Sequence, residues 1–374
     1  KHQITIDLLI CCGDFQAVRN TNDLDSMACS PKYRILNSFY KYYSGQLEAP
    51  IPTIFVAGNH EAAAHLYELP FGGWVANNIY YLGNCGCVNF GGLRIAGISG
   101  IYKDYDHQKP RFEKPPFNDE TMRSAYHQRN TDVLRLSKLE TTDILLSHDW
   151  PKGVTKHGDE QELLRFKSFF TEDIKNGNLG SPAVEYLMNQ LQPEYHFAAH
   201  LHCRFPAVVK HPSGKMTKFL ALDKVLPNRH FLQILEFPSD TPKDQLKLQY
   251  DSKWLAILKN THMLEHPLYA LNPPAEIITN IPTEEDIKKI ERRYELIYKQ
   301  TDLAIPNNFK TVQPAHNPAS PYSLPVPLDF YQTNELMELL GVENIFHFTP
   351  DVVGTSMASE TAADNPEEIQ LDEQ

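Results

Sequence analysis

The chain has 374 residues and a formal net charge of −12 at pH 7. This length allows one large domain with a sizeable core and a smaller appendage. The acidic balance disfavours broad nonspecific binding to nucleic acid, so any nucleic-acid site has to be a local patch. The six cysteines show no CxxC spacing, and neither a signal peptide nor a long apolar run is visible. These features favour an intracellular protein with reduced thiols and no membrane segment.

Four short apolar runs predict buried strands, at residues 7–11, 51–57, 144–147 and 195–199. A potential metal ligand follows each run, namely Asp14, Asn59, His148 and His200. The carboxyl ends of strands are where α/β proteins place their sites, because the sheet holds the loops rigidly while they stay open to solvent. We therefore expect these four side chains to meet in one site.

The types of these residues suit two cations. Asp14 can supply two carboxylate oxygens and so bridge a metal pair, and Asn59 offers a neutral oxygen that keeps the charge of the site low. His200 and His202 alternate by two, so both would face the same side of an extended segment. Taken singly, each is more often structural: Asp14 as a turn residue, and one His of the pair as the donor to a backbone carbonyl.

His60 follows Asn59, and an imidazole can protonate a leaving oxygen at neutral pH. We therefore predict His60 as the catalytic acid rather than as a ligand. Glu61 and Asp149, which follow His60 and His148, are predicted to orient the imidazoles. The predicted reaction is direct, metal-assisted hydrolysis of a phosphate ester.

The order Gly13-Asp14, Gly58-Asn59-His60-Glu61, His148 and His200-Leu201-His202 resembles the calcineurin-like metallophosphoesterase superfamily. The resemblance implies an α/β (α+β) fold, a two-sheet β-sandwich flanked by helices. It also implies that Asp14, Asn59, His148 and His200 hold one divalent metal, while Asp14 and His202 hold the other. One or two ions of Mn, Fe or Zn are expected.

The superfamily begins with a strand that ends in Asp-x-His or a variant with Cys, and nothing before Asp14 fits that motif. We therefore expect an upstream βα unit that the sequence omits, with residues 1–7 as the tail of its helix and the loop that follows.

A narrower resemblance lies in residues 9–20, 97–102 and 147–151, which look like the RNA lariat debranching enzyme family. It implies hydrolysis of the 2′,5′-phosphodiester bond at the branch point of excised intron lariats, which gives linear RNA for turnover. It also implies a nuclear location, with shuttling to the cytoplasm left open. Two rivals stay open: another phosphoesterase of the superfamily, such as a nuclease or protein phosphatase, and a non-catalytic scaffold.

An insertion at about residues 100–139 is rich in aromatic and cationic side chains, which can stack unpaired bases and meet phosphates. By resemblance it is the lariat-recognition loop. The predicted RNA-binding residues are Tyr102, Lys103, Tyr105, His107, Tyr126, His127 and Arg129. The alternative is a solvated irregular loop that ends in a helix at 119–138.

The predicted catalytic domain spans residues 1–250. Further strands are expected at 205–211, 218–222 and 231–237, the first two joined by a turn at 212–214. A helical appendage at 251–348 packs on the catalytic domain, with one helix opening at 282–286, a Pro- and Asn-rich connector at 305–328 and a helix near 333–340. Residues 349–374 read as an acidic, disordered tail with unknown partners, and we expect a monomer.

Overall fold

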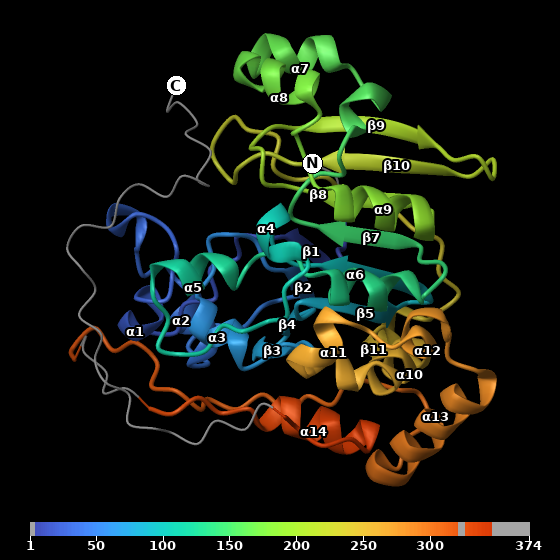
Figure 1. Cartoon of the computed structure of the whole chain (residues 1–374). Coiled ribbons are helices and arrows are strands. Elements are labelled where there is room, and N and C mark those ends of the chain that lie inside the picture. The colour runs from blue at the N-terminus through green and yellow to red at the C-terminus, as the bar shows by residue number, and fades with distance from the viewer. Residues whose placement is uncertain (1–3, 321–325, 346–374) are drawn as a thin grey trace.

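The computed structural model describes residues 4–320 and 326–345, in which two β-sheets pack together and helices cover their outer faces (Figure 1). The α/β two-sheet fold with a helical C-terminal region is thus confirmed. The predicted tail at 349–374 and the last residues of the appendage, 346–348, lie outside the described residues.

The smaller sheet has the strand order β1-β2-β4-β3. Strands β1, β2 and β4 are parallel, whereas β3 runs antiparallel to β4. Its strands are β1 Leu9–Cys12, β2 Thr53–Val56, β3 Gly73–Ala76 and β4 Ile79–Tyr81.

The larger sheet has the order β11-β5-β6-β7-β8-β10-β9, and its central strands β6, β7, β8 and β10 are parallel. The outer pairs β5–β6, β9–β10 and β5–β11 are antiparallel. Its strands are β5 Cys85–Phe90, β6 Leu93–Ile98, β7 Ile144–Ser147, β8 Tyr195–Ala198, β9 Phe205–Lys210, β10 Met216–Ala221 and β11 Leu248–Tyr250. The predicted hairpin at 205–222 is confirmed as β9–β10.

A core of aliphatic side chains lies between the sheets, with Val56 from the smaller sheet and Ile95 and Leu146 from the larger. Strands β2 and β7 are buried along their whole length, as their apolar runs predicted. A Cβ atom on Gly97 of β6 would come within 2.6 Å of Val56 Cγ1, so this glycine lets the two sheets approach closely. The close packing brings the loops that follow the two sets of strands together.

Helices cover both outer faces. On the smaller sheet, Phe39 and Leu66 pack against Phe55 and Tyr81. On the larger sheet, Leu136 of α6 packs in one core with Leu145 of β7. The helices outside the C-terminal region are α1 Thr21–Leu24, α2 Phe39–Tyr43, α3 Ala63–Tyr67, α4 Asp104–His107, α5 Asp119–Ser124, α6 Asn130–Ser137, α7 Glu160–Phe166, α8 Thr171–Asn176 and α9 Pro182–Leu191. Short 3₁₀ helices occur at Pro31–Tyr33, Val154–His157, Ser168–Phe170 (η3), Lys243–Gln245 and His262–Glu265.

The C-terminal region packs on the sheets rather than apart from them (Figure 1). Its helices are α10 Ser252–Asn260, α11 Pro267–Leu271, α12 Ala275–Thr279, α13 Glu284–Tyr298 and α14 Tyr331–Leu340. Helix α13 begins with the predicted capping box, in which Thr283 and Asp286 satisfy each other's backbone N–H groups. The Gln332 side chain of α14 bonds both the N–H and the C=O of Trp74 in β3, at 2.8 Å each.

Three sequence-based expectations about elements are wrong. Residues 231–237 form no strand, because they have no ladder partner, and Phe231 and Leu232 are exposed instead of buried on a sheet. The helix expected at 119–138 is two helices, α5 and α6, since residue His127 leaves the helical path to bridge Ile101. Strand β1 is only half-buried along its length, unlike the buried strand that the apolar run at 7–11 predicted.

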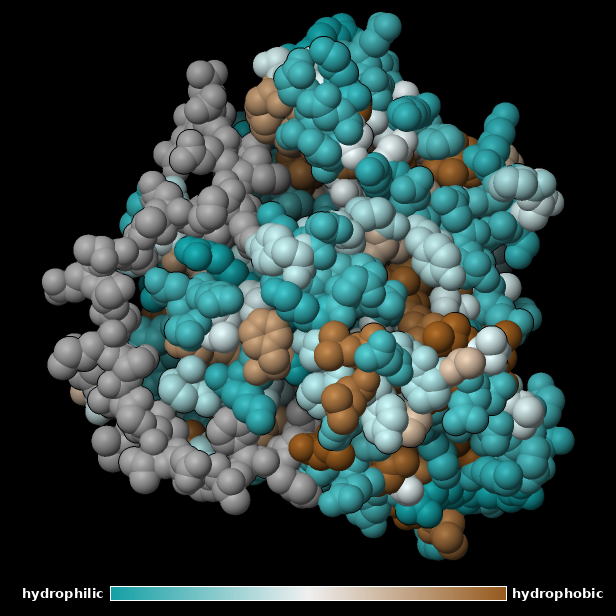
Figure 2. Space-filling view, viewed as in Figure 1, coloured by the Kyte–Doolittle hydropathy of each residue, from teal (hydrophilic) through white to brown (hydrophobic). Residues whose placement is uncertain are grey.

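The surface is mainly hydrophilic, with apolar side chains gathered over α11 and its neighbours (Figure 2). Leu268 and Leu271 of α11 are more than half exposed. None of the helices in the described ranges is long and apolar enough to be a membrane span.

Candidate metal centre

The predicted ligands follow the carboxyl ends of parallel strands in both sheets. Asp14 and Asn59 come after β1 and β2, and His148 and His200 come after β7 and β8. Because parallel strands end at the same edge, the two sheets deliver these loops to one place. The ring centroids of His148 and His200 lie 4.9 Å apart, and His148 Nε2 lies 3.5 Å from Asp14 Oδ1.

His148 is the centre of this arrangement. Its Nδ1 lies 2.7 Å from the carbonyl oxygen of Cys12, which can only accept, so the proton is assigned to Nδ1. Its Nε2 then presents a lone pair, 3.1 Å from Asn59 Oδ1 and 3.5 Å from Asp14 Oδ1. Three electron-pair donors therefore converge with no proton between them, which is the arrangement a cation stabilises.

Two glycines make room for this convergence. A Cβ atom on Gly13 would lie 2.1 Å from His148 Nδ1, and one on Gly58 would lie 2.1 Å from Asp14 Oδ1. Gly13 also has φ +103°, a conformation that side chains rarely adopt. The Gly residues of the Gly-Asp and Gly-Asn motifs are therefore spatial requirements of the site.

The ligand loops adopt strained backbone conformations. Asp14, His200 and His202 have φ values of 52°, 62° and 50°, in the left-handed region that non-glycine residues seldom occupy. The expectation that His200 and His202 alternate along an extended segment is thus wrong, because β8 ends at Ala198 and the chain bends. Such strain persists only where surrounding contacts enforce it, and three of the ten non-glycine residues with positive φ in the described ranges are predicted ligands.

The surroundings keep Asp14 ionised and the imidazoles of His200 and His202 neutral. Burial alone would raise the pKa of Asp14, but the positive charge that His148 and His60 can carry, together with the His60 N–H, brings it to about 2. Burial lowers the pKa of His200 well below its usual range and that of His202 to about 3. His202 Nδ1 is buried and has no hydrogen-bond partner among the described residues. Neutral imidazoles and a carboxylate are the protonation states that bind metals.

Glu61 contacts backbone N–H groups and not the imidazole that it was predicted to orient. Its carboxylate accepts the backbone N–H groups of Phe15 and Gln16, at 2.8 Å each, and of Gly58 at 3.1 Å. Burial, and then the charge of Asp14, raise the pKa of Glu61 to about 7. Instead of orienting an imidazole, Glu61 joins the loop after Asp14 to the loop that carries Asn59.

Asp149 also accepts backbone N–H groups instead of orienting an imidazole as predicted. It accepts the N–H groups of Tyr102 at 3.2 Å and Trp150 at 2.8 Å, and burial raises its pKa to about 6. The Trp150 indole donates to the carbonyl of Ala199 at 2.7 Å, which ties the His148 loop to the His200 loop. Asp149 therefore anchors the start of the insertion to the loop of His148.

His60 lies beside the convergence without belonging to it. Its backbone N–H donates to Asp14 Oδ1 at 3.0 Å, and the residue is partly exposed. In the described ranges no three His, Cys, Asp or Glu side chains form a ligand set by themselves. Asn59 adds an amide oxygen beside Asp14 and His148.

Two of the predicted RNA-binding residues are buried. His127 is 1% exposed and pairs with Asp106 at 2.7 Å, and Arg129 is fully buried, where it bonds Glu113 and the carbonyls of Asp106 and Ser124. The prediction that His127 and Arg129 contact RNA directly is therefore wrong for this conformation. They hold the insertion together.

The other predicted RNA-binding residues stay at or near the surface. Tyr105 is 60% exposed, whereas Tyr102, Lys103, His107 and Tyr126 are partly buried. The rings of Tyr102 and His107 lie 5.0 Å apart. At the root of the insertion, a Cβ on Gly100 would lie 1.8 Å from the Tyr126 carbonyl oxygen, so only glycine permits this crossing.

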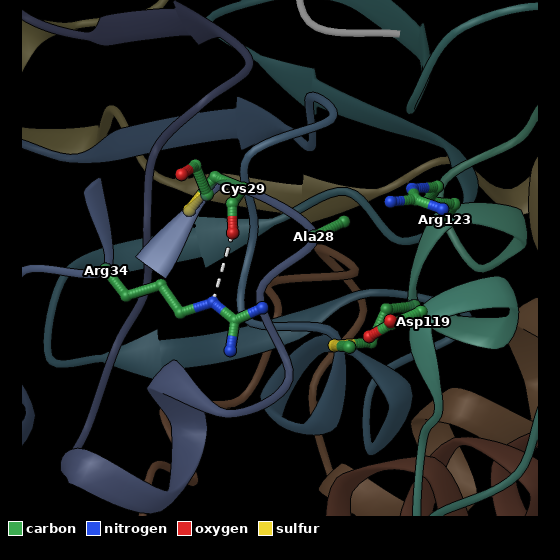
Figure 3. Close-up of a pocket in the computed structure, with 7 residues that line it drawn as sticks. Ala28, Cys29, Arg34, Asp119 and Arg123 are labelled. Atoms are coloured by element: carbon green, nitrogen blue, oxygen red, sulfur yellow. Dashed lines mark hydrogen bonds between the residues drawn. The ribbon is translucent and has the colours of Figure 1, made fainter. Parts of the chain in front are cut away.

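A small cavity lies apart from these ligands, between the segment after α1 and helix α5 (Figure 3). It measures about 10 Å³, room for about one water. Its lining residues are Ala28, Cys29, Ser30, Arg34, Asp119, Met122 and Arg123. Arg34 Nε donates to Cys29 O at 3.1 Å, while Arg123 Nε is buried without a partner in the described part of the chain. None of the predicted ligands lines this cavity, and a nucleotide would not fit in it.

Comparisons with known proteins agree with this geometry. The calcineurin-like phosphoesterase family matches residues 1–204, and the family described as "Lariat debranching enzyme, C-terminal domain" matches residues 214–345. The calcineurin-like fold implies divalent metal ions. The sequence-predicted boundary at residue 250 falls within the second match, between β11 and α10.

The lariat debranching enzyme of Arabidopsis thaliana is 43% identical over all of this chain and 89% of its own length. Those of Danio rerio and Homo sapiens are 46% and 47% identical over 92% and 84% of this chain. The alignments cover 62% and 59% of those two relatives, so the chain spans less than two thirds of their length. From these matches and the loops that converge on His148, the chain belongs to the lariat debranching enzyme family of calcineurin-like phosphoesterases.

Proposed function

We propose that this protein is a metal-dependent phosphodiesterase that hydrolyses the 2′,5′-phosphodiester bond at the branch point of excised lariat RNA. The family supports the reaction class, since its relatives are named lariat debranching enzymes. The single observation that carries the chemistry is the convergence of Asn59 Oδ1, Asp14 Oδ1 and His148 Nε2 at the edge where the sheets meet.

The residues present fit divalent cations. Asp14, Asn59, His148 and His200 would hold one ion, and Asp14 and His202 would hold the other. Mixed nitrogen and oxygen donors suit Mn, Fe or Zn. When bound, such cations stabilise negative charge on a phosphate and lower the pKa of water towards about 7.

The protein's own residues supply positioning and a proton. Glu61 and Asp149 hold the ligand loops and the start of the insertion at fixed separations through backbone N–H groups. His60 is partly exposed beside Asp14, where its imidazole can protonate the departing ribose oxygen. The strained loop of His200 and His202, anchored by the buried Leu201, limits movement of the site during reaction.

The insertion supports a substrate with unpaired bases. Tyr105 presents an exposed ring 5.8 Å from the Lys109 ammonium, and Tyr102 lies at the root of the insertion, tied to Asp149. Aromatic and cationic side chains in this arrangement stack bases and meet phosphates. We infer that the insertion holds RNA near the branch, and that the protein acts as a monomer in the nucleus, where introns are excised.

The test is hydrolysis of a synthetic branched RNA with one 2′,5′ linkage, beside a linear 3′,5′ control, by metal-free protein supplied with Mn, Fe or Zn. Cleavage of the 2′,5′ bond alone is expected. Cleavage of both linkages would instead indicate a general nuclease, and cleavage of neither, with metal bound, would contradict the proposal.

A further inference from the structure

The order of the parallel strands places two surfaces on opposite sides of the metal centre. The neighbours β6, β7, β8 and β10 all end at the same edge. The insertion follows β6, His148 follows β7, His202 follows β8, and Lys224 comes shortly after β10. The insertion and the segment after β10 therefore flank the predicted ligands from the two sides.

The surface beyond β10 gathers positive charge in an acidic protein. Lys167 follows α7, and Lys224 and Arg229 follow β10. Burial lowers the pKa of Lys167 most, and the charges of Arg229 and Lys224 lower it further, which agrees with a place on one surface. The nearby acid is Asp223, which lies 3.5 Å from Arg229 and accepts the Lys224 N–H at 2.7 Å. These three cations outnumber Asp223, the acid that contacts two of them, in a chain whose net charge is −12, while α7 also carries Glu160 and Glu162.

This charge adjoins the metal centre. Ala221 of β10 pairs with Ala198 of β8, and the Leu222 N–H donates to the Ala198 carbonyl at 3.1 Å, so Lys224 follows the strand beside the one that leads into His200 and His202. The segment before α7 lies at the same end of the sheet, since Gly158 bridges Ala207 of β9, which pairs with Phe219 of β10. An RNA phosphate bound at this surface would therefore be a neighbour of the branch-point phosphate that reacts in the metal centre.

Exposed aromatic side chains border the same cations. Phe166, at the end of α7, is 77% exposed, and Phe169 in η3 is 49% exposed, whereas the next residue, Phe170, is buried and anchors the segment. The Lys167 ammonium lies 5.6 Å from the centre of the Phe169 ring. The surface around α7 and α8 is otherwise mainly hydrophilic (Figure 2). Rings beside ammonium groups form a platform for unpaired bases and their phosphates.

We propose that this surface, which we call the α7 rim and define as Phe166, Lys167, Phe169 and Lys224, binds one single-stranded arm of the branched RNA while the insertion binds another. The proposal rests on the proposed function. A branch point joins more than one strand to the same nucleotide, so two arms leave the reacting phosphate in different directions. The two flanking surfaces match that requirement. Charge complementarity favours RNA over an apolar or basic protein partner, and the exposed Phe166 and Phe169 rings beside Lys167 favour stacked bases over an acidic protein.

The experiment measures binding of a non-hydrolysable branched RNA by fluorescence anisotropy over a range of salt concentrations. For Lys167→Gln/Lys224→Gln we expect Kd to rise roughly tenfold and the slope of log K against log salt to become shallower by about 1.4, since each single-strand phosphate contact contributes about 0.7. For Phe166→Ala/Phe169→Ala we expect Kd to rise roughly fivefold or more with the slope unchanged, because stacking carries no counterion release.

The control is Lys175→Gln in α8, whose side chain is 72% exposed and whose ammonium lies 3.8 Å from the Glu172 carboxylate. It removes one charge from the same helical segment and should behave as the wild type. If the double lysine variant has the same Kd and salt slope as this control, the α7 rim does not bind RNA. If the wild type fails to cleave branched RNA, the proposed function fails, yet the same salt slopes on a linear strand still decide whether Lys167 and Lys224 meet phosphates.

Discussion

The orientation of the His148 ring is set by a few contacts of its two nitrogen atoms. Its Nδ1 is fixed by the carbonyl of Cys12, and its Nε2 faces Asn59 and Asp14. A ring held at one nitrogen by a backbone carbonyl has a fixed tautomer and orientation, which leaves the other nitrogen available to a cation. Small displacements of this ring should therefore have large effects on rate.

Gly13→Ala tests this sensitivity. The new methyl group would lie 2.1 Å from His148 Nδ1, and the alanine would have to adopt a φ of +103°. We expect hydrolysis to fall by roughly 10²-fold, as for a displacement of about 1 Å in an active site. Activity and metal content would be measured together, with Gly45→Ala as control, since Gly45 also has positive φ (+76°) but no atom within 4 Å of its Cβ position. Equal activity of the two variants would show that space beside His148 is not required.

His60→Ala separates proton donation from metal binding. Hydrolysis of branched RNA should fall about 10²- to 10⁴-fold, the usual contribution of a general acid, while metal content stays near that of the wild type. The activity of His60→Ala on a p-nitrophenyl phosphodiester should fall much less, because that leaving group needs no proton. His200→Ala is the contrasting variant, because it should lose metal as well as rate. Near-normal turnover of branched RNA by His60→Ala would refute the acid assignment.

At the scale of elements, the insertion is held by buried ion pairs rather than by an apolar core. Arg129 bonds Glu113 and the Asp106 carbonyl, His127 bonds Asp106, and Arg111 bonds Asp132 at 2.7 Å. These pairs link α4, the loop after it and the start of α6. The exposed Tyr105 is thereby carried on a fixed frame.

Arg129→Met should loosen this frame. Removal of the guanidinium leaves the buried carboxylate of Glu113 without its partner, a change that costs roughly 3–5 kcal/mol. We expect faster hydrogen exchange in residues 101–129 and little change in the strands of the sheets, measured by mass spectrometry. If exchange is unchanged and only RNA affinity falls, Arg129 contacts RNA directly, as its sequence position first indicated.

The parts that sequence predicts well are those set by periodicity and topology. The strands before Asp14, Asn59 and His148 follow from their apolar runs, although only the last two are buried, and the meeting of the loops follows from parallel strand ends. The burial of Arg129 could not be read from the sequence, because its partner Glu113 is one of several acids in the insertion. Likewise, the pattern of 231–237 suits a strand, but a strand also requires a partner, which no local pattern supplies.

Across the whole molecule, the C-terminal region connects distant parts of the chain. The Gln332 amide completes hydrogen bonds at Trp74 in β3, and Thr333 donates to the carbonyl of Glu68 at 2.8 Å. The connector passes Tyr43, whose hydroxyl accepts the N–H of Gln313 at 2.8 Å. The region therefore stabilises the smaller sheet that carries Asp14 and Asn59.

Acid should destabilise the molecule partly through His65, which is buried beneath the smaller sheet's helices. Burial, and then the charge of Arg19, lower its folded-state pKa to about 3, and its Nδ1 donates to the carbonyl of Ala17 at 2.7 Å. In the unfolded chain the pKa is about 6.5. Because the folded value is the lower one, the contribution of His65 is complete above pH 6.5 and is lost as pH falls towards 3.

His65→Asn isolates this contribution, since the amide can still donate to Ala17 while it does not titrate. The variant should be less stable at pH 7.5 because the side chain is smaller. Below pH 6.5 the wild type should lose about 1.4 kcal/mol per pH unit relative to the variant, so the two free energies of unfolding converge. Denaturant unfolding at pH 7.5, 6.5, 5.5 and 5.0 measures both curves, and other titrating groups cancel in the difference. Parallel curves would mean that His65 is protonated in the folded protein.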